Sequence, residues 1–211
     1  MSSGSGTRCP GRPMKTRLAR RLRCLCFDLE NRPSAYWYED KTTAEITAIG
    51  WKWADEPEPR TLLLTSDGGF VGDDDRVVPA PVAYVIFRDQ LCQAGIVYGH
   101  NIRRHDLPLF QAGLLRLELP PLPPLVTQDT CRDLPKRKDL PVSLANLASL
   151  YGLPGEKFGM TQAMWEQANR LEPDGLVNTR KRVVGDVLLQ EALRARLLDL
   201  HLLSCPKEWA P

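Results

Sequence analysis

The apolar residues of the chain form short, dense runs in its first third. Residues 22–30 (LRCLCFDLE) are nearly all apolar until two acids appear at the end, which is typical of a strand buried on both faces. Residues 43–53 alternate and end in aromatic side chains, and residues 60–65 form a third apolar run. Because short connections join these three runs, the pattern predicts an antiparallel meander.

The pattern changes after residue 78. Helical spacing at 79–93 and 107–119 surrounds a short apolar strand at 95–99, and another strand is predicted at 125–130. Three helices are predicted beyond it: one capped by Ser143, a short one at about 161–170 and a long one at about 179–203. Three strands followed by this alternation predict an α/β fold, with a mixed five-stranded sheet and helices on both faces.

Length and composition favour one soluble domain. The chain has 211 residues, of which 43% are hydrophobic, and no apolar run approaches the roughly 20 residues of a membrane span. We expect the domain at 21–205, after a disordered basic arm at 1–20 and before a tail at 206–211. The formal net charge of +2 does not by itself indicate a nucleic-acid-binding protein. The six cysteines lack zinc spacing, so we expect reduced thiols in a cytoplasmic protein.

Two carboxylates stand at the end of the first predicted strand. Asp28 and Glu30 are two residues apart, which places both side chains on one face of a strand. Carboxylates this close repel each other unless a cation neutralises them, and Mg²⁺ prefers oxygen ligands. The pair therefore indicates a metal site, and a solvated strand end is the alternative.

A second acidic position follows the fourth predicted strand. In residues 98–109 (YGHNIRRHDLPL), a Gly-His-Asn turn leads into a helix that carries Asp106. His100, His105 and Asp106 could also belong to a zinc site or an HD-type metal site. That alternative needs further ligands, and the only other histidine is His201.

The third acidic position is Asp186, which lies in the last predicted helix within RVVGDVLLQEALRARL. An acid between apolar residues is costly to bury unless it is paired or bound to metal. The alternative is a surface position at the edge of the apolar stripe.

The order of these three features resembles that of the DEDD superfamily of proofreading 3′→5′ exonucleases. FDLE resembles the first motif, GHNIRRHDLP the second and VGDVLLQEAL the third, and SLANLASLYGLPGEKFGM resembles the stretch between the last two. The resemblance spans about residues 22–203. It implies a ribonuclease-H-like fold and hydrolysis of phosphodiester bonds from the 3′ end of single-stranded nucleic acid, with DNA favoured over RNA.

The resemblance also implies a ligand set and substrate contacts. It implies two divalent ions, Mg²⁺ or Mn²⁺, bound by four carboxylates: Asp28, Glu30, Asp106 and Asp186. Asn101 and His100 are the expected contacts to the terminal nucleotide. Tyr36 and Trp37, in a loop expected beside the carboxylates, could stack the unpaired 3′ base, or they could form a hydrophobic lid or core contact.

The chain departs from the family at the position that orients or deprotonates the attacking water. Family members carry a Tyr four residues, or a His five residues, before the last Asp, where this chain has Arg182 and Lys181. His105 also replaces a frequent Phe. The general base is therefore unassigned, and a nucleic-acid-binding module that does not hydrolyse is a second interpretation. A ribonuclease-H endonuclease is a third, although the Asp28 and Glu30 pair is an exonuclease trait.

Overall fold

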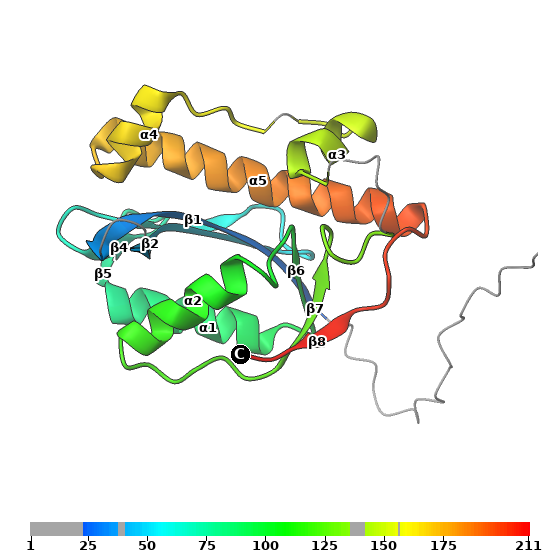
Figure 1. Ribbon diagram of the computed structural model, residues 1–211, viewed down its shortest axis with the longest axis horizontal. Helices are drawn as coiled ribbons and strands as arrows, with labels where there is room; N and C mark the ends of the chain where they lie inside the picture. The colour runs from blue at the N-terminus through cyan, green and yellow to red at the C-terminus, as the bar shows by residue number, and fades with distance from the viewer. Residues whose placement is uncertain (1–22, 38–40, 136–141, 156) are drawn as a thin grey trace, which may run out of the picture.

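A mixed sheet lies at the centre of the computed structural model (Figure 1). The structure describes residues 23–37, 41–135, 142–155 and 157–211, without the side chains of 34–37 and 41–43. The predicted basic arm at 1–20 lies outside these residues. The strands are β1 (Cys24–Trp37), β2 (Lys41–Trp53), β3 (Arg60–Leu64), β4 (Gly69–Val71), β5 (Val77–Pro79), β6 (Ile96–Gly99), β7 (Leu125–Asp129) and β8 (Lys207–Trp209).

Helices cover both faces of the sheet (Figure 1). The long helix α5 crosses one face together with α3 and α4, whereas α1 and α2 cover the other face. The helices are α1 (Ala80–Gln93), α2 (Asp106–Arg116), α3 (Leu144–Leu150), α4 (Gln162–Asn169) and α5 (Pro173–Asp199). The predicted α/β class is therefore confirmed. Within the described residues, no helix is both long enough and apolar enough to cross a membrane.

The sheet has eight strands in the described residues rather than the predicted five. The strand order is β5-β4-β3-β2-β1-β6-β7-β8, and the five predicted strands are its central β3, β2, β1, β6 and β7. β1 pairs antiparallel with β2 and parallel with β6. The three additional strands have three residues each, too few for alternation to show in the sequence. One of them, β8, lies in the stretch predicted as a tail and pairs with β7.

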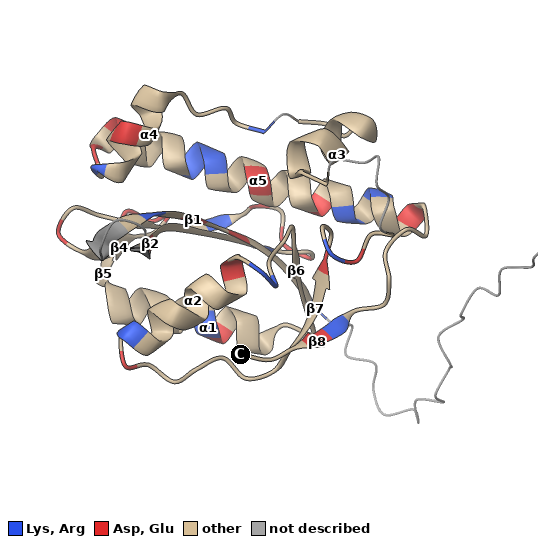
Figure 2. Ribbon diagram, viewed as in Figure 1, with Lys and Arg blue, Asp and Glu red and all other residues tan. Residues whose placement is uncertain are grey.

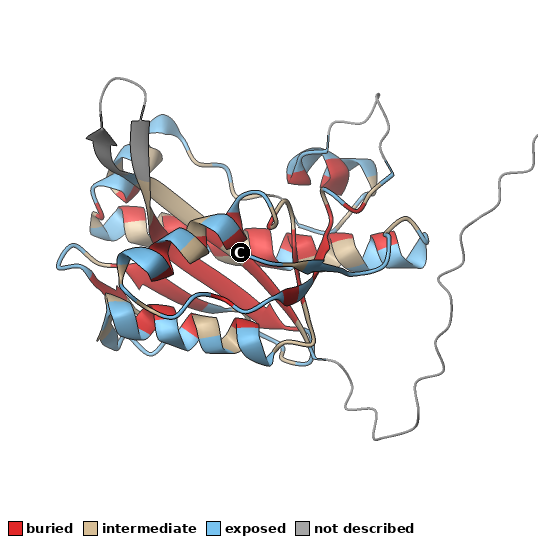
Figure 3. Ribbon diagram, turned by 60° about the horizontal axis from the view of Figure 1, so that its bottom comes forward, coloured by how far each residue is buried: buried red, intermediate tan, exposed pale blue. Residues whose placement is uncertain are grey.

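Alternate side chains of strand β1 lie on opposite faces of the sheet. Leu25, Phe27 and Leu29 belong to the main core on the side of α1 and α2. Cys26 packs against Val187 of α5 on the opposite face. Period-two geometry therefore turns Asp28 and Glu30, which follow Cys26 on the same face, toward α5. Figure 3 shows the strands at the centre of the sheet as buried.

Two glycines allow α5 to approach the sheet closely. Gly50 on β2 pairs with Asp28, and a Cβ atom at Gly50 would lie 2.7 Å from Val183 Cγ2 of α5. A Cβ atom at Gly99, at the end of β6, would lie 2.8 Å from Gln190 Oε1. The absence of side chains at these two positions brings the helix that carries Asp186 against the strand that carries Asp28.

Local signals set the starts of two helices. The Ser143 and Thr161 side chains cap α3 and α4 by accepting hydrogen bonds from backbone N–H groups, as expected of N-cap residues. The structure starts α5 at Pro173, six residues before the predicted start at 179. The Asp-Gly sequence at 174–175 is typical of a turn, but Gly175 packs against the backbone of α4, where a Cβ atom would lie 2.4 Å from the carbonyl carbon of Gln167.

The expectation of reduced thiols is confirmed for three described cysteines and is wrong for Cys205. Cys26, Cys92 and Cys131 are free thiols, but Cys205 is disulfide-bonded. No spacing in the sequence singles out Cys205.

Candidate metal centre

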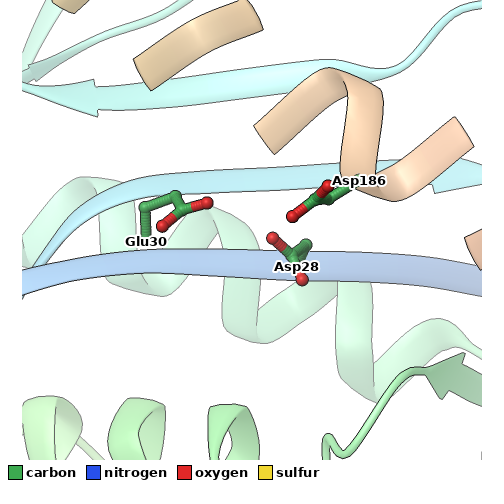
Figure 4. A group of neighbouring side chains, drawn as sticks. All are labelled: Asp28, Glu30 and Asp186. Carbon is green, nitrogen blue, oxygen red and sulfur yellow. The ribbon is translucent and has the colours of Figure 1, made fainter. Parts of the chain in front are cut away.

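Three predicted carboxylates meet between β1 and α5. Asp28 and Glu30 point from β1 toward Asp186 on α5 (Figure 4). One oxygen of each side chain lies within 4.8 Å of one oxygen of the other two. Asp186 is buried, whereas Asp28 and Glu30 are partly exposed. Two residues of β1 and a residue at least 156 positions later in the chain thus lie in one acidic cluster, as the order of the motifs predicted for these three.

The fourth predicted carboxylate, Asp106, lies beside this cluster. It is the first residue of α2, is only 3% exposed, and its Oδ1 accepts a hydrogen bond from the Leu29 backbone N–H at 3.2 Å. Asp106 does not belong to the group of three that could share one ion. The charge of Asp106 nevertheless affects Asp28. The pKa of Asp28 is raised well above its ordinary value, first by burial and then by the charges of Asp106, Asp186 and Glu30.

Two basic side chains neutralise part of this negative charge. Arg182 Nε lies 3.2 Å from Glu30 Oε1 and 3.1 Å from Asp186 Oδ2, and Lys157 Nζ lies 2.9 Å from the same Asp186 oxygen. Burial raises the pKa of Glu30, and the Arg182 charge acts against that rise. Figure 2 shows a basic segment of α5 next to the acidic one, above β1. Arg182, identified from the sequence as a departure from the family, is therefore part of the site.

The donor set fits a divalent cation. Asp186 Oδ1 is buried and has no hydrogen-bond partner among the described residues, although Asp186 Oδ2 has two cationic partners. A buried acceptor without a partner is costly. Carboxylate oxygens are the ligands that Mg²⁺ prefers. Asp28, Glu30 and Asp186 are therefore the residues that could hold an ion here.

Gln190 is a site residue that the sequence analysis missed. Its Nε2 donates to Asp28 Oδ1 at 2.7 Å, and its Oε1 accepts from the His100 backbone N–H at 3.1 Å. It is 1% exposed and lies one helical turn after Asp186. A glutamine on the buried stripe of α5, four residues from a candidate ligand, was the available signal. Gln190 fixes one oxygen of Asp28 and links it to the 100–106 segment.

Asp129 at the end of β7 shapes the segment that leads to Asp106. Its carboxylate is fully buried and accepts hydrogen bonds from the backbone N–H groups of Asn101 at 2.8 Å and Arg103 at 3.0 Å. It also accepts from the backbone N–H groups of residues 131 and 132. The φ angle of Asn101 is 65°, in the left-handed region. Asp129 was also missed, because a single acid at a strand end has no distinctive spacing.

The predicted substrate contacts have other partners within the chain. The Asn101 side-chain oxygen accepts from Arg132 Nη2 at 2.9 Å, and His100 Nδ1 lies 2.9 Å from Thr130 Oγ1. Burial lowers the pKa of His100. The side chains of Tyr36 and Trp37 lie outside the described residues, so their predicted stacking role stays a prediction.

A zinc or HD-type site does not form among the described residues. His105 is exposed, with its Nδ1 3.6 Å from Asp106 Oδ2, and this neighbouring carboxylate raises the pKa of His105. The metal-compatible group found in the part of the chain that the structure describes contains no histidine. The described side chains therefore favour an all-carboxylate centre.

Comparison with known proteins shows a shared fold. No family model and no curated protein matches the chain. Among solved structures, a family B DNA polymerase from the hyperthermophilic archaeon Pyrobaculum calidifontis is similar over 84% of this chain, with a TM-score of 0.56 and 16% sequence identity. The match spans 24% of the polymerase chain, so this chain corresponds to about a quarter of that protein's length. The chain thus shares its α/β fold with one part of a DNA polymerase.

Proposed function

We propose that the chain is a metal-dependent 3′→5′ exonuclease that shortens single-stranded nucleic acid from its 3′ end, with DNA favoured over RNA. One observation carries the proposal: carboxylates from β1 and α5 converge at one place, where Asp186 Oδ1 is buried without a hydrogen-bond partner. The motif order resembles that of proofreading exonucleases, and the fold is shared with part of a DNA polymerase. The shared fold supports a nucleic-acid-related role, and the motif order supports the exonuclease activity.

The side chains of the site would have different roles in metal binding and in positioning. Asp28, Glu30 and Asp186 would hold the divalent cation, and Asp106 would complete the acidic set beside Asp28. The cation would stabilise negative charge on the phosphate and activate water for in-line attack. Gln190 would keep Asp28 oriented, since it holds one oxygen of that carboxylate.

The test is a nuclease assay on a 5′-labelled single-stranded oligonucleotide, with Mg²⁺, Mn²⁺ or EDTA, followed on a denaturing gel. We expect a ladder that shortens one nucleotide at a time from the 3′ end and disappears in EDTA. Asp186→Asn should lower the rate by more than about 100-fold, because even residues behind metal ligands contribute 10–100-fold. Asp199→Asn, an exposed change on the same helix, is the matched control. Internal cleavage, or full activity in EDTA, would contradict the proposal.

A second candidate is a nucleic-acid-binding module that does not hydrolyse. The observation in its favour is Arg182, which stands at the family's tyrosine position and pairs with two of the carboxylates. A guanidinium cannot accept a proton near neutral pH. Fluorescence anisotropy with a labelled oligonucleotide separates the two candidates: tight binding without any shortening of the strand would favour the module.

A further inference from the structure

We propose that Arg182 takes the place of one of two divalent cations, so that the site holds a single ion while Arg182 is paired. This inference rests on the proposed metal-dependent function and specifies its cofactor. It concerns the number of divalent ions bound per chain, for which the family resemblance implies two.

The position of the Arg182 guanidinium supports the replacement of a second ion by this side chain. Arg182 Nε lies 3.2 Å from Glu30 Oε1, to which it donates a hydrogen bond, and 3.1 Å from Asp186 Oδ2, so one guanidinium nitrogen is ion-paired with two carboxylates of the cluster. Because Arg182 Nε already lies on one side of these two oxygens, a divalent cation that approached both of them from that side, at the 2.0–2.1 Å of Mg²⁺ or the roughly 2.3–2.6 Å of a larger ion, would overlap the guanidinium. An ion and the Arg182 side chain therefore exclude each other between Glu30 and Asp186.

Further contacts hold Arg182 in this place. Its Nη1 donates to the Phe158 carbonyl oxygen at 2.6 Å, and its side chain is only 16% exposed. The residue before Phe158 is Lys157, whose Nζ pairs with Asp186 Oδ2. The loop before α4 and the helix α5 thus each place one positively charged side chain, Lys157 and Arg182, at the acidic cluster. A hydrogen bond from Arg182 to the Phe158 carbonyl joins the loop to the helix there.

The formal charges indicate how many ions remain to be bound. The four carboxylates carry four negative charges when ionised, and Lys157 and Arg182 supply two positive charges. The two negative charges left over match one divalent cation. The ligands that remain for it are Asp186 Oδ1, which is buried and has no partner among the described residues, Asp28, and the Glu30 oxygen that Arg182 Nε does not contact.

Isothermal titration calorimetry with Mn²⁺ alone tests the inference, using the whole wild-type chain, Arg182→Gln and Lys181→Gln. We expect one ion per wild-type chain and two per Arg182→Gln chain. The second ion should bind the variant at least about tenfold more tightly than any second ion binds the wild type, since hydrogen bonds to charged groups reach that factor. Lys181→Gln removes the same charge from an exposed neighbour and should behave as the wild type.

Two results would overturn the inference. One is the binding of two ions of similar affinity to the wild-type chain, a measurement that decides the matter even if Arg182→Gln does not fold. The other is a folded Arg182→Gln variant that binds Mn²⁺ as the wild type does. Both results leave the proposed exonuclease intact, because hydrolysis is measured separately. Absence of any bound ion in all three chains would overturn the inference and the proposed metal dependence together.

Discussion

Replacing Asp28 by Asn distinguishes two effects of this carboxylate: its repulsion with the other acids in the metal-free protein, and its contribution to metal binding. The carboxyl of Asp28 lies near Glu30, Asp106 and Asp186, and burial together with these charges raises its pKa. An Asn side chain has nearly the same shape and can keep an oxygen in place to accept the 2.7 Å hydrogen bond from Gln190. The variant therefore removes one negative charge and one metal ligand, with little change in packing.

The raised pKa fixes the direction of the effect. The folded protein binds a proton on Asp28 more tightly than the unfolded chain does, so metal-free stability falls as pH rises from the ordinary Asp value through the raised folded pKa. Each unit by which the folded pKa is raised corresponds to about 1.4 kcal/mol. We expect Asp28→Asn in EDTA at pH 7–8 to be more stable than wild type, and the difference should appear as a higher Tm, since a 150–250-residue domain gains about 2–4 °C in Tm per kcal/mol.

Bound metal should make the wild type more stable than Asp28→Asn, the reverse of the order expected in EDTA. An ion at 100 times its dissociation constant stabilises the wild type by about 2.7 kcal/mol, and the variant should gain little because it lacks a ligand. Thermal unfolding between pH 5 and 8, in EDTA or Mn²⁺, measures both effects. Asp89→Asn, at an exposed position of α1, controls for the change of net charge. The reasoning is refuted if Asp28→Asn is less stable than wild type in EDTA at every pH, or if Mn²⁺ stabilises both proteins equally.

Two further substitutions test how the site is built. Asp129→Asn should destabilise the protein by at least about 2 kcal/mol, because it removes the charge and one acceptor oxygen from a buried group that accepts from the backbone N–H groups of residues 101, 103, 131 and 132. Urea unfolding measures this loss, and a value below about 0.5 kcal/mol would show that the carboxylate is dispensable. Gly50→Ala should cost about 1–3 kcal/mol through overpacking against Val183. The double variant Gly50→Ala/Val183→Ala should show a favourable coupling energy by the same measurement, and strictly additive losses would contradict the close contact.

The sequence predicted the elements whose signals are local and long. Strand β1 appeared as an apolar run with acids at its end, and the alternation that places Asp28 and Glu30 on one face needs no knowledge of the rest of the chain. The caps of α3 and α4 are equally local. The convergence of Asp28, Glu30 and Asp186 was predicted from the order of motifs and is present in the structure.

The parts of the site that were missed depend on distant contacts. Lys157 and Gln190 lie within the stretches that carry the family resemblance, but nothing in the sequence singled them out, because their importance comes from the oxygens of Asp186 and Asp28 that they contact. The sequence marked Arg182 as a departure, but its pairing with Glu30 requires the packing of α5 on the sheet. Edge strands such as β8 were missed for a different reason, since three residues carry too little pattern.

The alternation of β1 also restricts how this protein can vary. Phe27 belongs to the main core and Asp28 to the acidic cluster, although they are consecutive residues on one strand. Insertion or deletion of one residue just before Phe27 would exchange the two faces, sending the carboxylates into an aromatic core and Phe27 toward α5. Length changes in this stretch would therefore be lost to selection for folding before their effect on the site could matter. From Cys24 to Glu30, before the irregularities in the pairing of β1 with β2, diversification must proceed by substitution.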